Sequence, residues 1–245
     1  MKILLNLLLL FLCSSVASAQ TIVIDPGHGG RSYVGSQDER NLSSPNNATS
    51  PSGIKEKNLT LELSLILEER LKALAKTRKQ EVEVVLTRRE DINLNFTKRA
   101  AICAEASPAV IVSIHFNASR SGRGLGSLCV IQNQEANVNF ERDRVFANGL
   151  AEACSRAVRR YVPDSRSRGS IEDGYLHGGI GSNFFFQLSR YRRLREVPKC
   201  FLEVEFMDRD DVQEKLIDRR KESFPEIATE IAGFLLDWLV QDHHL

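Results

Sequence analysis

The sequence predicts an α/β fold, with one domain built on a mixed, mainly parallel sheet flanked by helices on both faces. Short runs rich in β-branched residues alternate with segments whose apolar residues recur every three or four positions, a pattern typical of strands alternating with helices. The run at 109–118 is almost continuously apolar, as in a strand that a parallel sheet buries on both faces. Residues 20–245 are enough for one domain with a sizeable core.

The first nineteen residues have the features of a secretion signal. Lys2 supplies a positive start, residues 3–12 are apolar apart from Asn6, and Ala17-Ser18-Ala19 fits the small-x-small pattern of a cleavage site. The apolar run is too short to span a bilayer comfortably, so no membrane span is expected. We expect residues 1–19 to be a signal peptide and the protein to be exported to the periplasm or the extracellular space.

Charge and cysteine content limit the partners and the chemistry. The chain has 33 lysines and arginines against 32 aspartates and glutamates, and loss of Lys2 with the signal balances them, so no nucleic-acid partner is expected. The four cysteines after the signal lack metal-type CxxC spacing, and both buried thiols and disulfides stay open for them. These cysteines are Cys103, Cys129, Cys154 and Cys200.

The first predicted strand places a histidine at its carboxyl end. Ile22-Val23-Ile24 is a short buried strand, which Asp25-Pro26-Gly27 ends because proline cannot extend a ladder and glycine tolerates a tight turn. His28 follows this turn, at the edge where open α/β sheets place their chemistry.

A long polar loop and a helix follow. Residues 31–55 are rich in Ser, Asn, Pro and Gly, and both a mobile surface loop and a functional lid stay open for them. Leu59, Leu63 and Leu67 then begin an apolar helical stripe, which Glu56 precedes at the first turn. Taken alone, Glu56 would be explained by the helix dipole.

The other elements are predicted from the same patterns of apolar periodicity, proline and caps. In chain order, they are a strand at 82–87, a helix at 95–107, a strand at 109–118, a strand at 126–132, a helix at 142–161, an irregular span at 162–198, a strand at 200–206, and a closing helix that begins with the capping box Ser223-Phe224-Pro225-Glu226.

His28, Glu56 and His115 are the candidate metal ligands. His115 ends the strand at 109–118, as His28 ends the first strand. Two imidazoles and a carboxylate suit a zinc ion with an open fourth position for water, whose pKa the metal lowers. Glu203, in the last strand, is the candidate acid/base, because burial would raise its pKa into a useful range. Considered alone, Glu203 would be read as a strand residue facing solvent.

Five blocks with these residues occur in one order along the chain: Asp25-Pro26-Gly27-His28-Gly29-Gly30, Glu56 at a helix start, Leu86-Thr87-Arg88, Ser113-Ile114-His115-Phe116-Asn117-Ala118, and Pro198-x-x-x-x-Glu203 followed by Phe206. Together they resemble the zinc-dependent N-acetylmuramoyl-L-alanine amidases of bacterial cell walls. The resemblance implies one Zn²⁺ per chain on His28, Glu56 and His115, with Glu203 catalytic. It implies that residues 20–245 are a zinc amidase catalytic domain. The substrate would be peptidoglycan or a muropeptide, cleaved between the lactyl group of N-acetylmuramic acid and L-alanine.

Four more residues are candidates for contact with substrate or for support of the metal ligands: Asp25, Asn117, Glu205 and His177. Glu205 stands where the family commonly has glycine. The two-residue alternation of a strand predicts that it shares a face with Glu203, so it is the second choice for catalysis. For His177 the preferred explanation is a surface-loop histidine. We expect a monomer, and a protein activator and a segment covering the site stay open.

Two other functions keep the same residues. A non-catalytic wall-binding or regulatory module of the same fold would bind peptidoglycan without releasing peptides. A zinc peptidase would cut within the stem peptide, whereas an amidase releases whole stems that begin with L-alanine. Product identification distinguishes these functions.

Overall fold

The computed structural model describes residues 19–119, 121–176 and 179–241. The expected signal peptide, except Ala19, lies outside the described residues, and so does His177. Among the helices in the described ranges, none combines the length and the apolar character that a membrane crossing requires.

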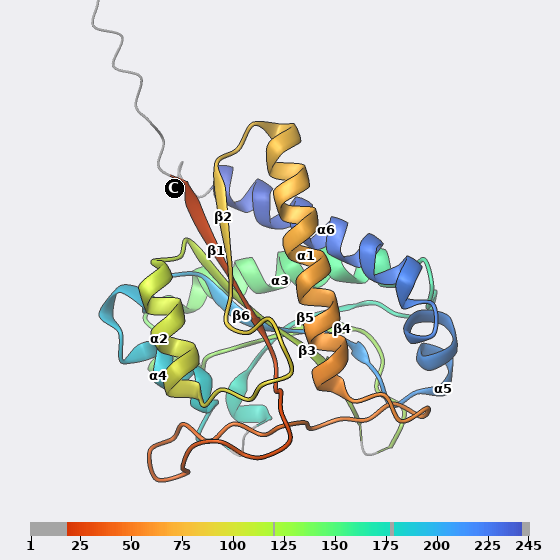
Figure 1. Ribbon diagram of the computed structural model, residues 1–245, viewed down its shortest axis with the longest axis horizontal. Helices are drawn as coiled ribbons and strands as arrows, with labels where there is room; N and C mark the ends of the chain where they lie inside the picture. Colours follow the sequence, from red (N-terminus) through yellow and green to blue (C-terminus); the bar gives the residue numbers. More distant parts are fainter. Residues whose placement is uncertain (1–18, 120, 177–178, 242–245) are drawn as a thin grey trace, which may run out of the picture.

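A six-stranded sheet forms the centre of the protein, with the strand order β2-β1-β3-β6-β4-β5 (Figure 1). The strands are β1 (Gln20–Pro26), β2 (Val82–Leu86), β3 (Val110–Asn117), β4 (Ser127–Ile131), β5 (Ser167–Glu172) and β6 (Lys199–Phe206). The strands β2, β1, β3 and β6 are parallel. The strand β4 runs antiparallel to β6, and β5 runs parallel to β4. The predicted mixed, mainly parallel sheet is confirmed.

Helices cover both faces of the sheet, as predicted (Figure 1). The helices are α1 (Glu56–Arg78), α2 (Phe96–Ala106), α3 (Phe140–Val158), α4 (Asn183–Ser189), α5 (Asp210–Val212) and α6 (Arg220–Gln241). The larger core lies under α1, α3 and α6 and contains the leucine stripe of α1. A smaller core, with Phe184, Phe185 and Phe201, lies under α2 and α4 on the other face.

The span at 162–198 is more regular than the sequence predicts, because it contains β5 and α4. The sequence of β5 is Ser-Arg-Gly-Ser-Ile-Glu, which has one large apolar residue and no alternation. As the outermost strand it pairs with β4 alone among the described strands, so it needs little apolar surface. The helix α4 has seven residues, too few for a helical period to appear.

The expected capping box at the start of the closing helix is wrong. The helix α6 begins at Arg220, so Ser223 lies inside it. The Ser223 hydroxyl donates to the carbonyl of Leu216, at 2.8 Å, and does not cap an N-terminus. Pro225 lies in the helix interior, where it lacks an N–H for the carbonyl of Lys221.

All four cysteines of the described chain are buried free thiols, which settles the choice that the sequence left open. Burial raises the pKa of Cys154 to about 12. Thiols in this state are inert members of the core.

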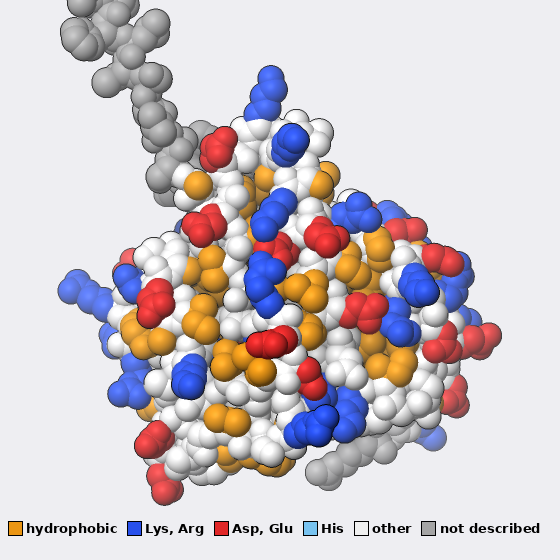
Figure 2. Space-filling view, in the orientation of Figure 1, with side chains coloured by type: hydrophobic (Ala, Val, Ile, Leu, Met, Phe, Trp, Pro, Cys, Tyr) orange, Lys and Arg blue, Asp and Glu red, His pale blue; other side chains and the backbone are white. Residues whose placement is uncertain are grey.

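Charged side chains of both signs are interspersed over the face shown in Figure 2. Several form ion pairs, such as Arg78 with Asp237 and Arg220 with Glu62. This mixture agrees with the formal net charge of +1.

Candidate metal centre

Three segments meet at the carboxyl ends of β1 and β3. These strands are parallel, with Pro26 opposite Ile114, so the residues that end them lie at one edge of the sheet. His28 follows β1, His115 lies near the end of β3, and Glu56 is the first residue of α1. The topology therefore brings together side chains that lie far apart in the sequence.

The turn after β1 has a backbone conformation that few residues adopt. His28 has a φ of 60°, and the φ values of Gly29 and Gly30 are 131° and 66°. A non-glycine residue with positive φ is strained, and such strain occurs most often at functional sites. A Cβ on Gly27 would lie 2.3 Å from Cε1 of His115, so only glycine leaves room for this ring.

Glu56 lies between the two imidazoles. Its Oε1 is 3.1 Å from Nε2 of His28 and 3.1 Å from Nδ1 of His115, and one ligand atom from each residue lies within 4.8 Å of the others. The backbone N–H groups of Ala48 and Phe116 also donate to this carboxylate. Burial raises the pKa of Glu56, but the adjacent His28 and His115 rings outweigh burial and hold the pKa of this carboxyl well below its usual range.

Hydrogen bonds on the far side of each ring fix both tautomers. The Nδ1 of His28 lies 3.1 Å from the carbonyl oxygen of Ser44, which only accepts, so Nδ1 carries the hydrogen. The Ser113 hydroxyl donates to Oδ2 of Asp25 at 2.7 Å and therefore accepts from Nε2–H of His115 at 3.1 Å. The remaining lone pairs, on Nε2 of His28 and Nδ1 of His115, face Glu56.

Asp25 is a buried carboxylate surrounded by donors. Arg99 donates to it at 2.6 Å and also to the carbonyl of His28 at 2.6 Å, and the hydroxyls of Thr87 and Ser113 donate as well. Burial raises the pKa of Asp25, but the Arg99 charge and these hydrogen bonds lower it more, so the pKa lies below its usual range. Asp25 thus stays ionised and orients Ser113, which in turn orients His115.

The three inner groups fit a cation. In these tautomers two imidazole lone pairs and a carboxylate oxygen converge with no hydrogen between them, and Nε2 of His28 is buried without a hydrogen-bond partner. Ligands on a tetrahedral zinc ion, at 2.0–2.1 Å from the metal, lie about 3.3 Å apart, close to the 3.1 Å that separates Oε1 of Glu56 from each imidazole. Without a cation these three electron-rich atoms repel one another, and a divalent cation between them would replace this repulsion with attraction.

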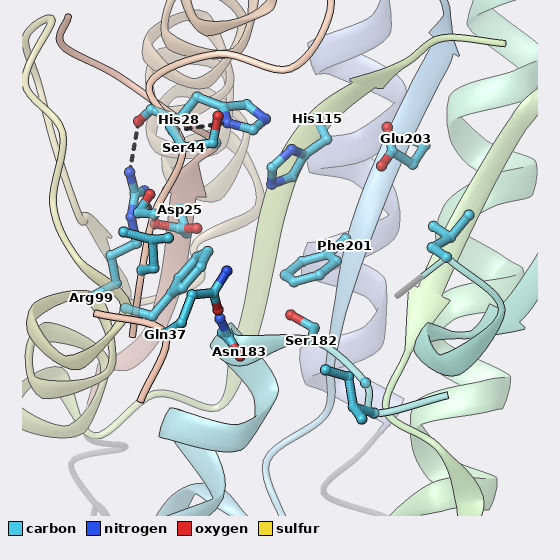
Figure 3. Close-up of a pocket in the computed structure, with 17 residues that line it drawn as sticks. Asp25, His28, Gln37, Ser44, Arg99, His115, Ser182, Asn183, Phe201 and Glu203 are labelled. Atoms are coloured by element: carbon cyan, nitrogen blue, oxygen red, sulfur yellow. Dashed lines mark hydrogen bonds and ion pairs between the residues drawn. The ribbon is translucent and has the colours of Figure 1, made fainter. Parts of the chain in front are cut away.

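Glu203 borders the same cavity from β6. It lies opposite His115 in the register between β3 and β6, and the cavity of about 320 Å³ is lined by His28, His115 and Glu203 (Figure 3). Burial raises the pKa of Glu203 to about 7, which Glu56 increases and His115 opposes. Its Oε2 is buried without a hydrogen-bond partner among the described residues. A carboxyl in this state is able to take up and release a proton near neutral pH.

Glu205 and Asn117 do not line this cavity. A β-bulge separates the pairs His115–Glu203 and Asn117–Phe206, so the alternation that places Glu205 on the face of Glu203 is interrupted. The Glu205 carboxylate accepts from the Gly126 and Phe206 N–H groups and from the Ser165 hydroxyl. The Asn117 side chain accepts from the N–H of Ala118. Both side chains therefore hold local structure beside the site.

The long loop and the start of α4 form adjoining walls of the cavity. Gln37 comes from the loop and Asn183 from α4, with Phe201 of β6 also bordering the space (Figure 3). Arg40 ties the walls together, donating to the carbonyl of Ile180 at 2.9 Å. The loop at 31–55 is therefore an ordered part of the site.

Sequence reasoning missed most of the side chains that support the ligands. The helix that contains Arg99 was predicted from its apolar residues, which give no information about the role of the arginine. Ser44 contributes a backbone carbonyl, which no side-chain pattern reveals. Two signals were available. Ser113 precedes His115 by two residues and so shares its strand face, and Thr87 belongs to the Leu86-Thr87-Arg88 block.

A mainly parallel sheet with a His-Glu-His cluster and a buried carboxyl at its carboxyl edge has the features of a hydrolase site in an α/β enzyme. The family model described as "N-acetylmuramoyl-L-alanine amidase" (Amidase_3) matches residues 22–235. The chain belongs to this family, and the resemblance found in the sequence is confirmed.

Individual relatives agree with this assignment. The chain is 27% identical over 230 residues to the probable N-acetylmuramoyl-L-alanine amidase AmiB of Haemophilus influenzae, and the match covers 84% of the chain and 49% of AmiB. The chain thus spans about half the length of this curated relative. The catalytic domain of the amidase CwlV from Bacillus (Paenibacillus) polymyxa has the same fold, with a TM-score of 0.62, 23% identity, and coverage of 90% and 98% of the two chains. The CwlD amidase of Clostridioides difficile, solved in complex with the GerS lipoprotein, gives a TM-score of 0.61, 18% identity, and coverage of 91% and 100%.

Proposed function

We propose that the protein is a zinc-dependent N-acetylmuramoyl-L-alanine amidase, which hydrolyses the amide between the lactyl group of N-acetylmuramic acid and L-alanine in peptidoglycan. One observation carries this proposal. One acceptor atom each from His28, Glu56 and His115 converges on a common point, and the buried carboxyl of Glu203 borders the same cavity as the two histidines. Family membership supplies the substrate class.

His28, Glu56 and His115 would hold the zinc ion. When bound, the ion supplies a Lewis acid that polarises the scissile carbonyl and lowers the pKa of a coordinated water. The carbonyl of Ser44 keeps the hydrogen of His28 on Nδ1, and Ser113 keeps that of His115 on Nε2. Both rings are therefore oriented before any metal arrives, which favours binding because little freedom remains to be lost.

Glu203 would serve as the general base and then as the general acid. As a base, its free Oε2 takes the proton of the attacking water, and as an acid it returns the proton to the nitrogen of L-alanine as the amide breaks. Burial in an apolar strand keeps the proton affinity of this carboxyl high enough for both steps. Phe201 covers the sheet beside it and limits the access of bulk water.

Family membership also supports export, since peptidoglycan lies outside the cytoplasm. We propose that residues 1–19 direct secretion to the periplasm or the extracellular space. The CwlD amidase was solved in complex with a lipoprotein, which supports the proposal that a partner protein binds this chain and activates it.

Digestion of purified peptidoglycan tests this function. The zinc-loaded protein should release whole stem peptides beginning with L-alanine, identified by mass spectrometry, and a chelator should abolish the release until zinc is restored. The zinc assignment would be contradicted if digestion continued in the presence of the chelator. It would also be contradicted if elemental analysis found no zinc in the protein after loading. Products with a cut stem would indicate a peptidase, and binding without products a wall-binding module.

Glu203→Gln tests the acid/base role, because glutamine keeps the shape but cannot exchange a proton. The variant should retain zinc and lose about 10²- to 10⁴-fold in kcat. An active Glu203→Gln together with an inactive Glu205→Gln would transfer the role to Glu205.

A further inference from the structure

We propose that the substrate site continues along α4 into a cationic subsite, where Arg195 binds a carboxylate of the stem peptide at the third residue beyond the cleaved amide. This inference rests on the proposed function. Beyond that function, it gives the direction in which the stem peptide lies and names a residue that favours stem peptides with a free carboxylate.

Two further hollows adjoin the catalytic cavity. A middle hollow shares residues 180–182 with that cavity, and a distal hollow shares Gln132, Ala136 and Ser189 with the middle one. Asn183, the first residue of α4, borders the catalytic cavity, and Ser189, its last, borders both hollows. The row of hollows therefore follows α4 from one end to the other.

Each hollow contains an arginine without a carboxylate partner. Arg195 borders the distal hollow, where its Nε donates to the carbonyl of Ser189 at 2.7 Å, which fixes the exposed guanidinium over the end of α4. Arg40 borders the middle hollow and lies over the ring of Phe186, 4.1 Å from its centroid. Among the described residues, neither arginine forms an ion pair, in contrast to Arg144, Arg156, Arg159 and Arg160, which pair with glutamates.

The carboxylate that borders the middle hollow already has hydrogen-bond donors. Asp173 borders the middle hollow, but its oxygens accept from the N–H groups of Asn133 and Ser182. The polar groups that remain, such as the amide of Gln132 in the distal hollow, are neutral. The row thus presents a net positive charge with amide partners, which suits an anionic peptide.

The length of α4 sets the position of the carboxylate. Its seven residues rise about 10 Å at 1.5 Å per residue. An extended peptide advances about 3.3 Å per residue, so three residues cover the distance from the border of the catalytic cavity at Asn183 to the end of α4. The stem peptide carries free carboxylates, whereas the N-acetylated glycan is neutral. The stem therefore lies along α4, and the glycan leaves the metal centre on the other side.

A pair of synthetic muropeptides tests the subsite. Both have a three-residue stem, which ends in a free carboxylate in one and in a carboxamide in the other. The wild-type enzyme should cleave the carboxylate form about tenfold better in kcat/KM, mainly through a lower KM, because the amide loses a charged hydrogen bond. Arg195→Gln should remove this preference without changing kcat, and Arg195→Lys should restore part of it.

Arg193→Glu is the matched control, because Arg193 is an exposed arginine of the same turn that borders none of the three hollows. It should keep the preference. Equal cleavage of both muropeptides by the wild type, or an equal loss in Arg193→Glu and Arg195→Gln, would overturn the subsite and leave the amidase function intact. If the wild type cleaved neither muropeptide, the proposed function itself would fail. Melting curves verify that the Arg195 variants are folded.

Discussion

The tautomer of His115 depends on an ion pair that this residue does not touch. Arg99 and Asp25 form this buried pair at the border of the cavity, and the Ser113 hydroxyl connects Asp25 to the His115 ring. Histidine ligands of metals are commonly oriented by a carboxylate that accepts directly from the ring. Here the hydroxyl of Ser113 stands between Asp25 and His115, which adds one hydrogen bond to this arrangement. The quality of the metal centre should therefore depend on residues that never contact the metal.

Ser113→Ala should weaken zinc binding while the three ligands stay in place. Without the hydroxyl, Nε2–H of His115 loses its acceptor and the ring is free to rotate or change tautomer, which should cost about 10- to 100-fold in metal affinity. Competition with a chromophoric chelator measures the loss. Ser155→Ala is the control, because this buried hydroxyl has no hydrogen-bond partner among the described residues, and an equal loss in both variants would contradict the relay.

Asp25→Asn should make the protein less stable at neutral pH. The variant leaves Arg99 buried without its counter-ion, which should lower the free energy of unfolding by about 3–5 kcal/mol. The pKa of Asp25 is lower in the folded than in the unfolded state, so its contribution is complete above the unfolded value of about 3.9 and is lost as the pH falls through the folded value. Urea unfolding at pH 7 and pH 3 should therefore show a gap between wild type and variant that shrinks in acid. A gap independent of pH would exclude an ionised Asp25.

Residue types and their positions, at the ends of two strands and the start of a helix, were enough to select the three side chains that the structure brings together. The local sequence could not show how they are supported, because Arg99 reaches Asp25 across 74 positions and Ser44 acts through its backbone. The side of β6 on which Glu205 lies was also hidden, because a single extra residue in a bulge leaves no mark on the apolar pattern.

At the level of elements, strands and helices with a large apolar face were predictable, and those without one were not. The strand β3 is recognisable because four of its first five residues are apolar. By contrast, β5 is specified by its pairing with β4, and α4 by the burial of Phe184 and Phe185, which are tertiary effects. The start of α6 was misplaced because a sequence that fits a cap is also compatible with a helix interior.

Pro225→Ala should stabilise α6. Alanine restores the N–H that proline lacks and removes a ring from the helix interior, which stabilises the folded state. The unfolded chain gains conformational entropy when proline is removed, and this gain offsets part of the stabilisation. We expect the free energy of unfolding to rise by about 1–2 kcal/mol, measured by urea denaturation. An unchanged or lower value would mean that the surrounding packing has adapted fully to the proline.

For the whole molecule, zinc should act as a cross-link between distant parts of the chain. Its proposed ligands lie on β1, α1 and β3, so an ion bound only by the folded state stabilises the complete fold. Zinc at about 1,000 times its Kd adds about 4 kcal/mol, which should raise Tm by roughly 8–16 °C for a domain of this size. Differential scanning calorimetry measures this shift. His115→Ala should respond much less, and an equal rise in that variant would place the metal elsewhere.

The strand order has a consequence for the timing of biosynthesis. The last strand of the chain, β6, lies in the middle of the sheet, between β3 and β4, and it carries Glu203. During synthesis, both histidines are therefore present long before Glu203 is added. Until β6 is made, β2-β1-β3 and β4-β5 each have an unpaired edge at the position that β6 later fills. On the proposed mechanism, hydrolytic activity is therefore the final property that the newborn chain acquires, and a product that terminates before β6 lacks the acid/base.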